Sequence, residues 1–308
     1  MAYILRTQGL TKAYRGEEVV SEVNMNVRRG EIYGFLGPNG AGKTTVMKMI
    51  TNLMKPSGGE IEVLGEKVHG TSYELLKRMG SIIEYPIFYE KLTARKNLEL
   101  HCEYMGYYDK KAISEALALV NLINVEDKPV KEFSLGMKQR LGIARAVMTK
   151  PEILILDEPV NGLDPVGMHE LRDLFMKLSR QYGITLLISS HNLAEIEHIA
   201  DTIGVIRKGK LIKEASMDEI RSLHANHLEL AVEDYPKAAF VLENELKAKN
   251  FRVKEDKGVI NIYDDHISQN DIIQAMVRSQ VEIGAINHKK QPLEDYFLQL
   301  IGGGNPNA

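Results

Sequence analysis

The chain has 308 residues, of which 44% are apolar and 26% charged, and its formal net charge is −3. This is ordinary globular composition, enough for one large domain or two smaller ones, and the total charge does not indicate a nucleic-acid partner. Cys102 is the sole cysteine, which excludes a disulfide within the chain and is typical of a reducing compartment. The N-terminus lacks the pattern of a signal peptide, and no apolar run approaches the roughly 20 residues that span a bilayer. We therefore expect a soluble protein that serves a membrane only by docking to another chain.

The N-terminal part is expected to form strands and one helix. Alternating or β-branched residues predict three strands, at 3–5, 21–27 and 61–63. Residues 31–36 predict a further strand, which leads directly into a glycine-rich turn. A helix is expected to follow this turn, from about Gly42 to Leu53. This succession of strand, glycine-rich turn and helix is a common setting for a phosphate-binding loop.

The central part alternates between helices and buried strands. Residues 93–147 predict a helical region, because apolar residues recur there at a spacing of three and four. Continuous apolar runs at 153–156 and 184–188 predict strands of a parallel sheet that is covered on both faces. A hairpin is expected after them, with strands at 203–206 and 210–213. These signals together predict an α/β fold.

The character of the sequence changes after about residue 215. Residues 216–219 have the pattern of a capping box that opens a short helix. The remainder predicts a small α+β domain, with strands at 228–232, 252–254, 259–263 and 283–287 and helices at 236–249, 269–279 and 293–300. Residues 302–308 are expected to be disordered. We therefore divide the chain into a domain over 1–215, with a helical subdomain at about 93–147, and a C-terminal accessory domain over 216–308. Two roles stay open for the latter, namely regulation or dimer support and plain stabilisation.

Residues 37–44 read Gly-Pro-Asn-Gly-Ala-Gly-Lys-Thr and match the phosphate-binding pattern G-x-x-x-x-G-K-[ST]. Glycines permit backbone angles that turn N–H groups inward, and these groups hold phosphate together with the helix N-terminus. Lys43 is expected to reach the β- and γ-phosphates, and Thr44 to offer its hydroxyl to Mg²⁺. The alternative, a plain glycine-rich turn, does not explain eight matched positions. The expected ATP-binding residues in this loop are Gly37, Pro38, Asn39, Gly40, Ala41, Gly42, Lys43, Thr44 and Thr45.

Two adjacent carboxylates, Asp157 and Glu158, follow the strand predicted at 153–156. Ligands bind at the carboxyl edge of open α/β sheets, so both acids are expected at a ligand site. Asp157 is expected to hold Mg²⁺ through water, and Glu158 to polarise the attacking water as a general base. The alternative is that the pair merely caps the next helix. The presence of a phosphate loop in the same domain favours the catalytic interpretation.

Four further elements narrow the class of nucleotide-binding protein. Residues 134–140 read Ser-Leu-Gly-Met-Lys-Gln-Arg and precede the acidic strand, whereas 161–164 read Asn-Gly-Leu-Asp and follow it. In the latter stretch Asp164 is also the expected N-cap of a helix, with a proline in its first position and a glycine, at 183, at its end. His191 ends the next strand, and Tyr14 belongs to the early strand pair. Each element alone has a bland explanation, but their order and spacing within one domain are informative.

On these residues the chain resembles ABC transporter nucleotide-binding subunits, over about residues 1–215. The resemblance implies a P-loop NTPase of ABC type with a mixed sheet core, an antiparallel β subdomain and a helical subdomain. It also implies two copies packed head to tail as a homodimer, because the chain has one P-loop, and integral-membrane permease subunits as partners at the inner face of the cell membrane. ATP would lie between one copy's loop and the other's signature residues, Ser134, Leu135, Gly136, Met137 and Gln139. The usual form of that signature is L-S-G-G-Q, from which positions 133, 135 and 137 depart.

The resemblance also implies roles for single residues. Tyr14 would stack on adenine, and His191 would act as the switch histidine beside Lys43 and Glu158. Asp164 would belong to the D-loop, which couples the two copies. Glu84 departs from the family, because a glutamine that senses Mg²⁺ and the permease usually stands at the matching position. A carboxylate there can strengthen metal binding while it repels phosphate.

Such a substitution is a feature of the subgroup that exports bacitracin or protects against lantibiotics, and residues 80–97 and 133–145 are similar to the bacitracin-resistance ATPases. The resemblance therefore implies the motor subunit of a bacterial exporter of a peptide antibiotic, or of another drug or lipid-like substrate. Glu84 as a neutral variation is the alternative. Import stays possible, and so does a non-transport ABC ATPase that acts on ribosomes or DNA, although one P-loop and the lack of sustained heptads disfavour it. An unrelated P-loop kinase or GTPase would not carry the signature stretch or His191.

Overall fold

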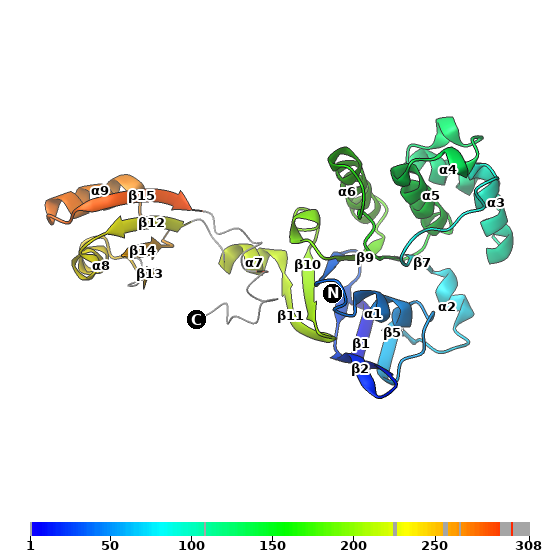
Figure 1. Cartoon of the computed structure of the whole chain (residues 1–308), viewed down its shortest axis with the longest axis horizontal. Coiled ribbons are helices and arrows are strands. Elements are labelled where there is room, and N and C mark those ends of the chain that lie inside the picture. Colours follow the sequence, from blue (N-terminus) through cyan, green and yellow to red (C-terminus); the bar gives the residue numbers. More distant parts are fainter. Residues whose placement is uncertain are drawn as a thin grey trace. The chain divides into compact units, whose positions relative to one another are not determined.

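A computed structural model describes residues 2–107, 109–223, 227–254, 258–264, 266–289 and 297. The chain divides into two compact units, Met1–Met217 and Asp218–Ala308 (Figure 1). Each unit has a core of its own, and each is described by itself below. None of the helices described combines the length and the apolar character needed to cross a bilayer.

An antiparallel sheet opens the first unit. Its strand order is β2-β1-β5-β6, with β3 paired to β1; the strands are β1 (Tyr3–Tyr14), β2 (Glu17–Val23), β3 (Asn26–Arg28), β5 (Gly58–Val63) and β6 (Glu66–Lys67). The first strand is much longer than the sequence predicted, because it pairs with three neighbours along its length. The strand predicted at 21–27 is divided into β2 and β3 by residues 24 and 25, and Glu22 near the end of β2 adopts a left-handed φ of 49°.

The central sheet has the order β11-β10-β4-β9-β8-β7. Its strands are β4 (Ile32–Leu36), β7 (Met79–Ile82), β8 (Ile153–Leu156), β9 (Thr185–Ser190), β10 (Thr202–Arg207) and β11 (Lys210–Ser216). All neighbours are parallel except the predicted hairpin of β10 and β11, so the sheet is mixed. Every residue of β4, β8 and β9 is buried, which explains their continuous apolar sequences. Parallel pairing brings the carboxyl ends of these strands to one edge.

Helices cover and flank this sheet (Figure 1). They are α1 (Lys43–Ile50), α2 (Tyr73–Lys77), α3 (Ala94–Met105), α4 (Lys110–Leu119), α5 (Leu135–Val147) and α6 (Pro165–Arg180), with short 3-10 turns at Ile123–Val125, Val130–Glu132 and Leu193–Glu195. Helices α3, α4 and α5 contact one another and form the predicted helical region. Helix α6 begins as predicted, because Asp164 Oδ1 accepts the Gly167 N–H at 3.0 Å. It ends at Arg180, before the predicted Gly183, and α1 ends at Ile50, before the predicted Leu53.

The core of the first unit places α1 firmly between the two sheets. Val46, Met47 and Ile50 of this helix are fully buried in one cluster with residues of β1, β4 and β8. Each such side chain contributes about 1.5–3 kcal/mol through burial. The phosphate loop at the start of α1 therefore begins from a rigid support.

The second unit is a four-stranded antiparallel sheet with two helices. The chain passes from α7 (Met217–Leu223), at the division, through β12 (His227–Val232), α8 (Tyr235–Asn244), β13 (Phe251–Lys254), β14 (Val259–Ile262), α9 (Gln269–Arg278) and β15 (Ile283–Lys289), and the sheet order is β13-β14-β12-β15. Helix α8 ends before the predicted residue 249, because Lys247 adopts φ of 54°. The predicted helix at 293–300 and the predicted disorder at 302–308 lie outside the described residues, apart from Phe297, which is helical and buried.

Candidate functional site

The loop of residues 37–42 connects β4 to α1, as the sequence predicted. Gly37 is required there, because a Cβ on it would lie 2.3 Å from the backbone oxygen of Ile206. Gly42, directly before the helix, has φ of 107°, a conformation that residues with a side chain rarely adopt. The glycines of this motif are therefore needed for close approach and for backbone direction.

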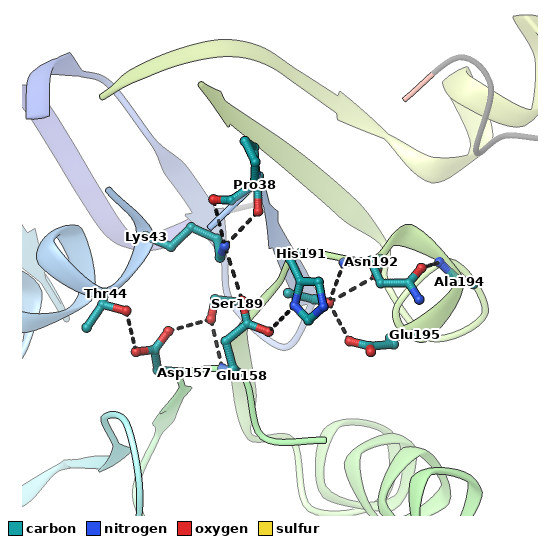
Figure 2. A network of polar contacts seen from close by, with 12 residues as sticks. Pro38, Lys43, Thr44, Asp157, Glu158, Ser189, His191, Asn192, Ala194 and Glu195 are labelled. Carbon is teal, nitrogen blue, oxygen red and sulfur yellow. Dashed lines mark hydrogen bonds and ion pairs between the residues drawn. The ribbon is translucent and has the colours of Figure 1, made fainter. Parts of the chain in front are cut away.

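Lys43 begins α1, and its side chain is buried within the loop that precedes it. Its Nζ donates to the backbone oxygens of Gly37 and Pro38 at 2.6 and 3.3 Å. The same ammonium lies 3.1 Å from Glu158 Oε1, which makes an ion pair but not a hydrogen bond (Figure 2). The structure therefore brings together the loop cation and the acid that the sequence predicted as general base.

Asp157 is the centre of an oxygen cluster at the end of β8 (Figure 2). Thr44 Oγ1 donates to its Oδ2 at 2.7 Å, and Ser189 Oγ donates to its Oδ1 at 2.6 Å. Ser189 Oγ also accepts the backbone N–H of Glu158 at 2.9 Å. Sequence reasoning missed Ser189, although its position near the end of a buried strand next to β8 is the signal that could have found it.

Hard oxygen donors of this kind suit Mg²⁺, which is commonly bound by one or two carboxylates together with substrate phosphates. Thr44 and Asp157 supply a hydroxyl and one carboxylate from adjoining elements. Within the ranges that the structure describes, no three His, Cys, Asp or Glu residues gather as a site for a metal held by protein alone. The donor set therefore fits a magnesium ion that phosphate oxygens also bind.

Glu158 uses both carboxylate oxygens in this arrangement. Its Oε2 lies 2.8 Å from His191 Nδ1, while Oε1 faces Lys43. The side chain is 19% exposed, and the backbone at Glu158 is left-handed with φ of 48°. A strained backbone of this kind persists only where surrounding contacts hold it, which is common at functional sites. Glu158 is thus a firmly held carboxylate between a cation and an imidazole.

The turn that carries His191 is fixed by its neighbours. Ser190 Oγ accepts the Asn192 N–H at 2.9 Å and contacts the Glu195 carboxylate, and Asn192 caps the following turn (Figure 2). These contacts hold His191 at the end of β9, as the sequence predicted. Asn192 and Glu195 were not predicted, because no motif in the sequence includes them.

Residues from the stretches 134–140 and 161–164 line a hollow of about 430 Å³. Ser134 caps α5, with its Oγ accepting the Met137 N–H at 3.2 Å. Ser134, Leu135, Gly136 and Asp164 line the hollow, whereas Gln139 is buried on another side of α5. The lining residues do not include any of the phosphate loop. The structure therefore brings three of the five predicted signature residues together with the D-loop, at a hollow that the phosphate loop of the same chain does not line. Met137 and Gln139 are not among the lining residues.

Tyr14 and Glu84 have partners that lie outside the phosphate loop. Tyr14 ends β1, is 46% exposed, donates to Met54 Sδ at 2.9 Å and has Lys12 Nζ 5.2 Å from its ring centroid. Glu84 follows β7, has φ of 64°, and its Oε1 lies 2.5 Å from Lys48 Nζ. Sequence reasoning did not single out Lys48.

A groove beside α3 was also missed by sequence reasoning. His101, Tyr104 and Arg145 line both of its hollows, each of about 370 Å³. Burial, and then the charge of Arg145, lower the pKa of His101 to about 4. Burial also lowers the pKa of Arg145, which donates to the backbone oxygen of Ile87 at 2.8 Å. Ile87 itself is 83% exposed, next to exposed tyrosines at 85 and 89.

A phosphate-binding loop, a carboxylate–hydroxyl pair suited to Mg²⁺ and a held glutamate at one sheet edge define a P-loop NTPase. The family profile "ABC transporter" matches residues 20–161. The uncharacterized ABC transporter ATP-binding protein YcbN of Bacillus subtilis (strain 168) is 59% identical, with both chains covered completely. The bacitracin transport ATP-binding protein BcrA of Bacillus licheniformis is 44% identical, with 99% of each chain covered. The chain belongs to the family of ABC transporter ATP-binding proteins.

Two further comparisons agree with this family. The lantibiotic transport ATP-binding protein SrtF of Streptococcus pyogenes is 44% identical over 71% of this chain and 94% of its own length. A solved structure titled "Structure of ATP binding subunit of ABC transporter" is 30% identical, has a TM-score of 0.64, and covers 71% of this chain and 92% of that chain. The predicted ABC-type fold and ATPase activity are confirmed, and relatives that serve bacitracin and lantibiotic transport match the predicted subgroup. Members of this family bind ATP and work with membrane permease components.

Proposed function

We propose that this ATPase binds Mg²⁺-ATP at residues 37–45 and hydrolyses it with Glu158 as the general base. The observation that carries the proposal is the position of the Glu158 carboxylate, 3.1 Å from Lys43 Nζ and 2.8 Å from His191 Nδ1. Phosphate oxygens compete with Glu158 for the Lys43 ammonium, so nucleotide binding frees Glu158 Oε1 to accept a proton from water. His191 then keeps the carboxylate oriented through its Oε2.

Thr44 and Asp157 hold the magnesium ion in this proposal. A bound Mg²⁺ neutralises charge on the β- and γ-phosphates. Ser189 donates to the oxygen of Asp157 that does not face Thr44, and so it fixes the orientation of the carboxylate. Tyr14, exposed at the end of β1, is the proposed adenine contact.

Two copies act together in the same proposal. The hollow around Ser134 and Gly136 receives the triphosphate held by the loop of a second copy, and Asp164 couples the two sites. Support comes from the exposure of its rim, since Leu135 is 46% and Val166 is 66% exposed. The start of α5, which Ser134 caps, is suited to an anion. Hydrolysis removes the shared phosphate, and the pair opens.

The permease partner lies at the inner face of the cell membrane, with this chain on the cytoplasmic side. Its proposed contact is the exposed segment that follows Glu84 and includes Tyr85, Ile87 and Tyr89. We further propose that the transported substrate is a peptide antibiotic of bacitracin or lantibiotic type, exported from the cell. The carboxylate at position 84 supports this, and so do the relatives named for bacitracin and lantibiotic transport. A role on ribosomes or DNA is not favoured by these relatives.

The test is co-purification of the chain with the membrane protein encoded beside it, followed by ATPase assays in lipid vesicles. Bacitracin or a lantibiotic should stimulate hydrolysis several-fold, and cells that express the pair should tolerate more of the same peptide. A complex carrying Glu158→Gln is the control and should give neither effect. An active complex that responds to neither peptide contradicts the substrate assignment but leaves the ATPase site intact.

A further inference from the structure

Glu84 lies at the same sheet edge as the proposed magnesium site. It stands two residues after Ile82, the last residue of β7, whose backbone oxygen accepts the Asp157 N–H at 2.9 Å. Strands β7 and β8 are parallel neighbours, so their ends bring Glu84 and Asp157 to one side of the sheet. Glu84 adopts a left-handed φ of 64°, directly before the exposed segment at 85–89.

Helix α1 faces this edge with two side chains one turn apart. Thr44 and Lys48 are four residues apart and therefore lie on one face of the helix. Thr44 Oγ1 donates to Asp157 at 2.7 Å, and Lys48 Nζ donates to Glu84 Oε1 at 2.5 Å. The phosphate-binding helix thus makes one contact to the residue after β8, through Thr44, and one to the segment after β7, through Lys48.

Stability alone is a poor explanation for the second contact. Lys48 and Glu84 are 30% and 58% exposed, and ion pairs between exposed side chains contribute about 0–1 kcal/mol. The position of the pair is more informative, because Glu84 adds a third carboxylate to the sheet edge that also carries Asp157 and Glu158, where we propose that a triphosphate binds. A like charge near an anion opposes binding, unless a cation compensates it or a metal ion uses it.

We propose that Lys48 is a positioning residue, which pairs with Glu84, compensates its charge near the triphosphate and ties the exposed segment at 85–89 to the phosphate-binding helix. Lys48 thereby allows a carboxylate to occupy this position without loss of nucleotide affinity. This inference rests on the proposed nucleotide site. Movement of the segment at 85–89 changes the distance from Glu84 to Lys48, and so it changes the charge that the triphosphate experiences.

The test is a double-mutant cycle in the full-length chain with Lys48→Gln, Glu84→Gln and the double variant. Equilibrium binding of a fluorescent ATP analogue with Mg²⁺ gives the Kd, and steady-state hydrolysis gives KM and kcat. Lys48→Gln should raise Kd and KM roughly three- to tenfold with little change in kcat, because it leaves Glu84 uncompensated. The double variant should return to within about twofold of the wild type, since the repelling charge is then absent. Lys48→Arg should behave as the wild type.

The matched control is Lys67→Gln, which breaks the exposed Lys67–Glu60 pair in β6 and β5 and should leave Kd and KM unchanged. An unchanged Kd in Lys48→Gln, or a double variant as weak as the single one, overturns the role of Lys48. Absence of nucleotide binding in the wild type instead contradicts the proposed site itself, so the two failures are distinguishable.

Discussion

Glu158→Gln separates the two roles that we propose for this carboxylate, as general base and as competitor for Lys43. The change keeps the size of the side chain and removes its charge. Loss of a general base costs about 10²- to 10⁴-fold in rate, so kcat should fall by that factor. ATP should bind at least as well as before, because Glu158 no longer competes for Lys43, whose Nζ keeps its bonds to Gly37 and Pro38. We expect a Kd about two- to tenfold lower, which corresponds to at most about 1.4 kcal/mol.

Phosphate-release kinetics, nucleotide-binding titration and size-exclusion chromatography with Mg²⁺-ATP measure the three consequences. The variant should accumulate as a closed dimer with ATP, because hydrolysis no longer opens the pair. Glu60→Gln, in an exposed ion pair outside the site, is the matched control and should hydrolyse ATP normally. Full hydrolysis by Glu158→Gln would refute the assignment of Glu158 as general base. A higher Kd for ATP would refute the idea that Glu158 and phosphate oxygens compete for Lys43.

Two other changes test the phosphate loop, and a third tests the groove beside α3. Lys43→Ala should weaken Mg²⁺-ATP binding by at least about 100-fold, because it removes the charge buried under the loop; binding within tenfold of the wild type contradicts this. Gly37→Ala should abolish nucleotide binding and lower the melting temperature, since its Cβ would lie 2.3 Å from the Ile206 oxygen. His101 has a folded pKa of about 4, below its ordinary value of 6.5, so its contribution to stability is present above pH 6.5 and is lost as the pH falls toward 4. Between pH 7 and pH 4.5, the free energy of unfolding measured with urea should therefore fall by about 1–3 kcal/mol less in His101→Gln than in the wild type. Equal decreases in the two proteins would contradict a partly buried, neutral imidazole at His101.

The elements whose sequence signal is local were predictable. The strand at 153–156 needs only four apolar residues between turns, and α6 needs only Asp164 and Pro165 at its start. The length of β1 was not predictable, because most residues beyond Leu5 are polar or glycine, without regular alternation, and the strand extends through pairing with three other strands. Long-range pairing of this kind leaves no periodic signal within the strand itself.

The same distinction applies to the candidate site. Lys43, Thr44, Asp157 and Glu158 were predicted because short motifs carry them. The structure joins them in two pairs, a hydrogen bond from Thr44 to Asp157 and an ion pair between Lys43 and Glu158. Ser189 was not predicted, because its role depends on β9 lying next to β8. Lys48 was missed for the same reason, since nothing in the sequence of α1 indicates that it faces Glu84. Single residues that act across strands are visible only once the sheet order is known.

The charges at the sheet edge indicate which step of the cycle rearranges the site. Each of the three carboxylates already has partners within the chain: Asp157 has two hydroxyls, Glu158 has Lys43 and His191, and Glu84 has Lys48. In the proposed mechanism, phosphate oxygens take the place of Glu158 Oε1 beside the Lys43 ammonium when a triphosphate binds. That exchange would release the proposed general base when its substrate arrives. Binding of the nucleotide, before any hydrolysis, would then be the event that prepares Glu158 for catalysis.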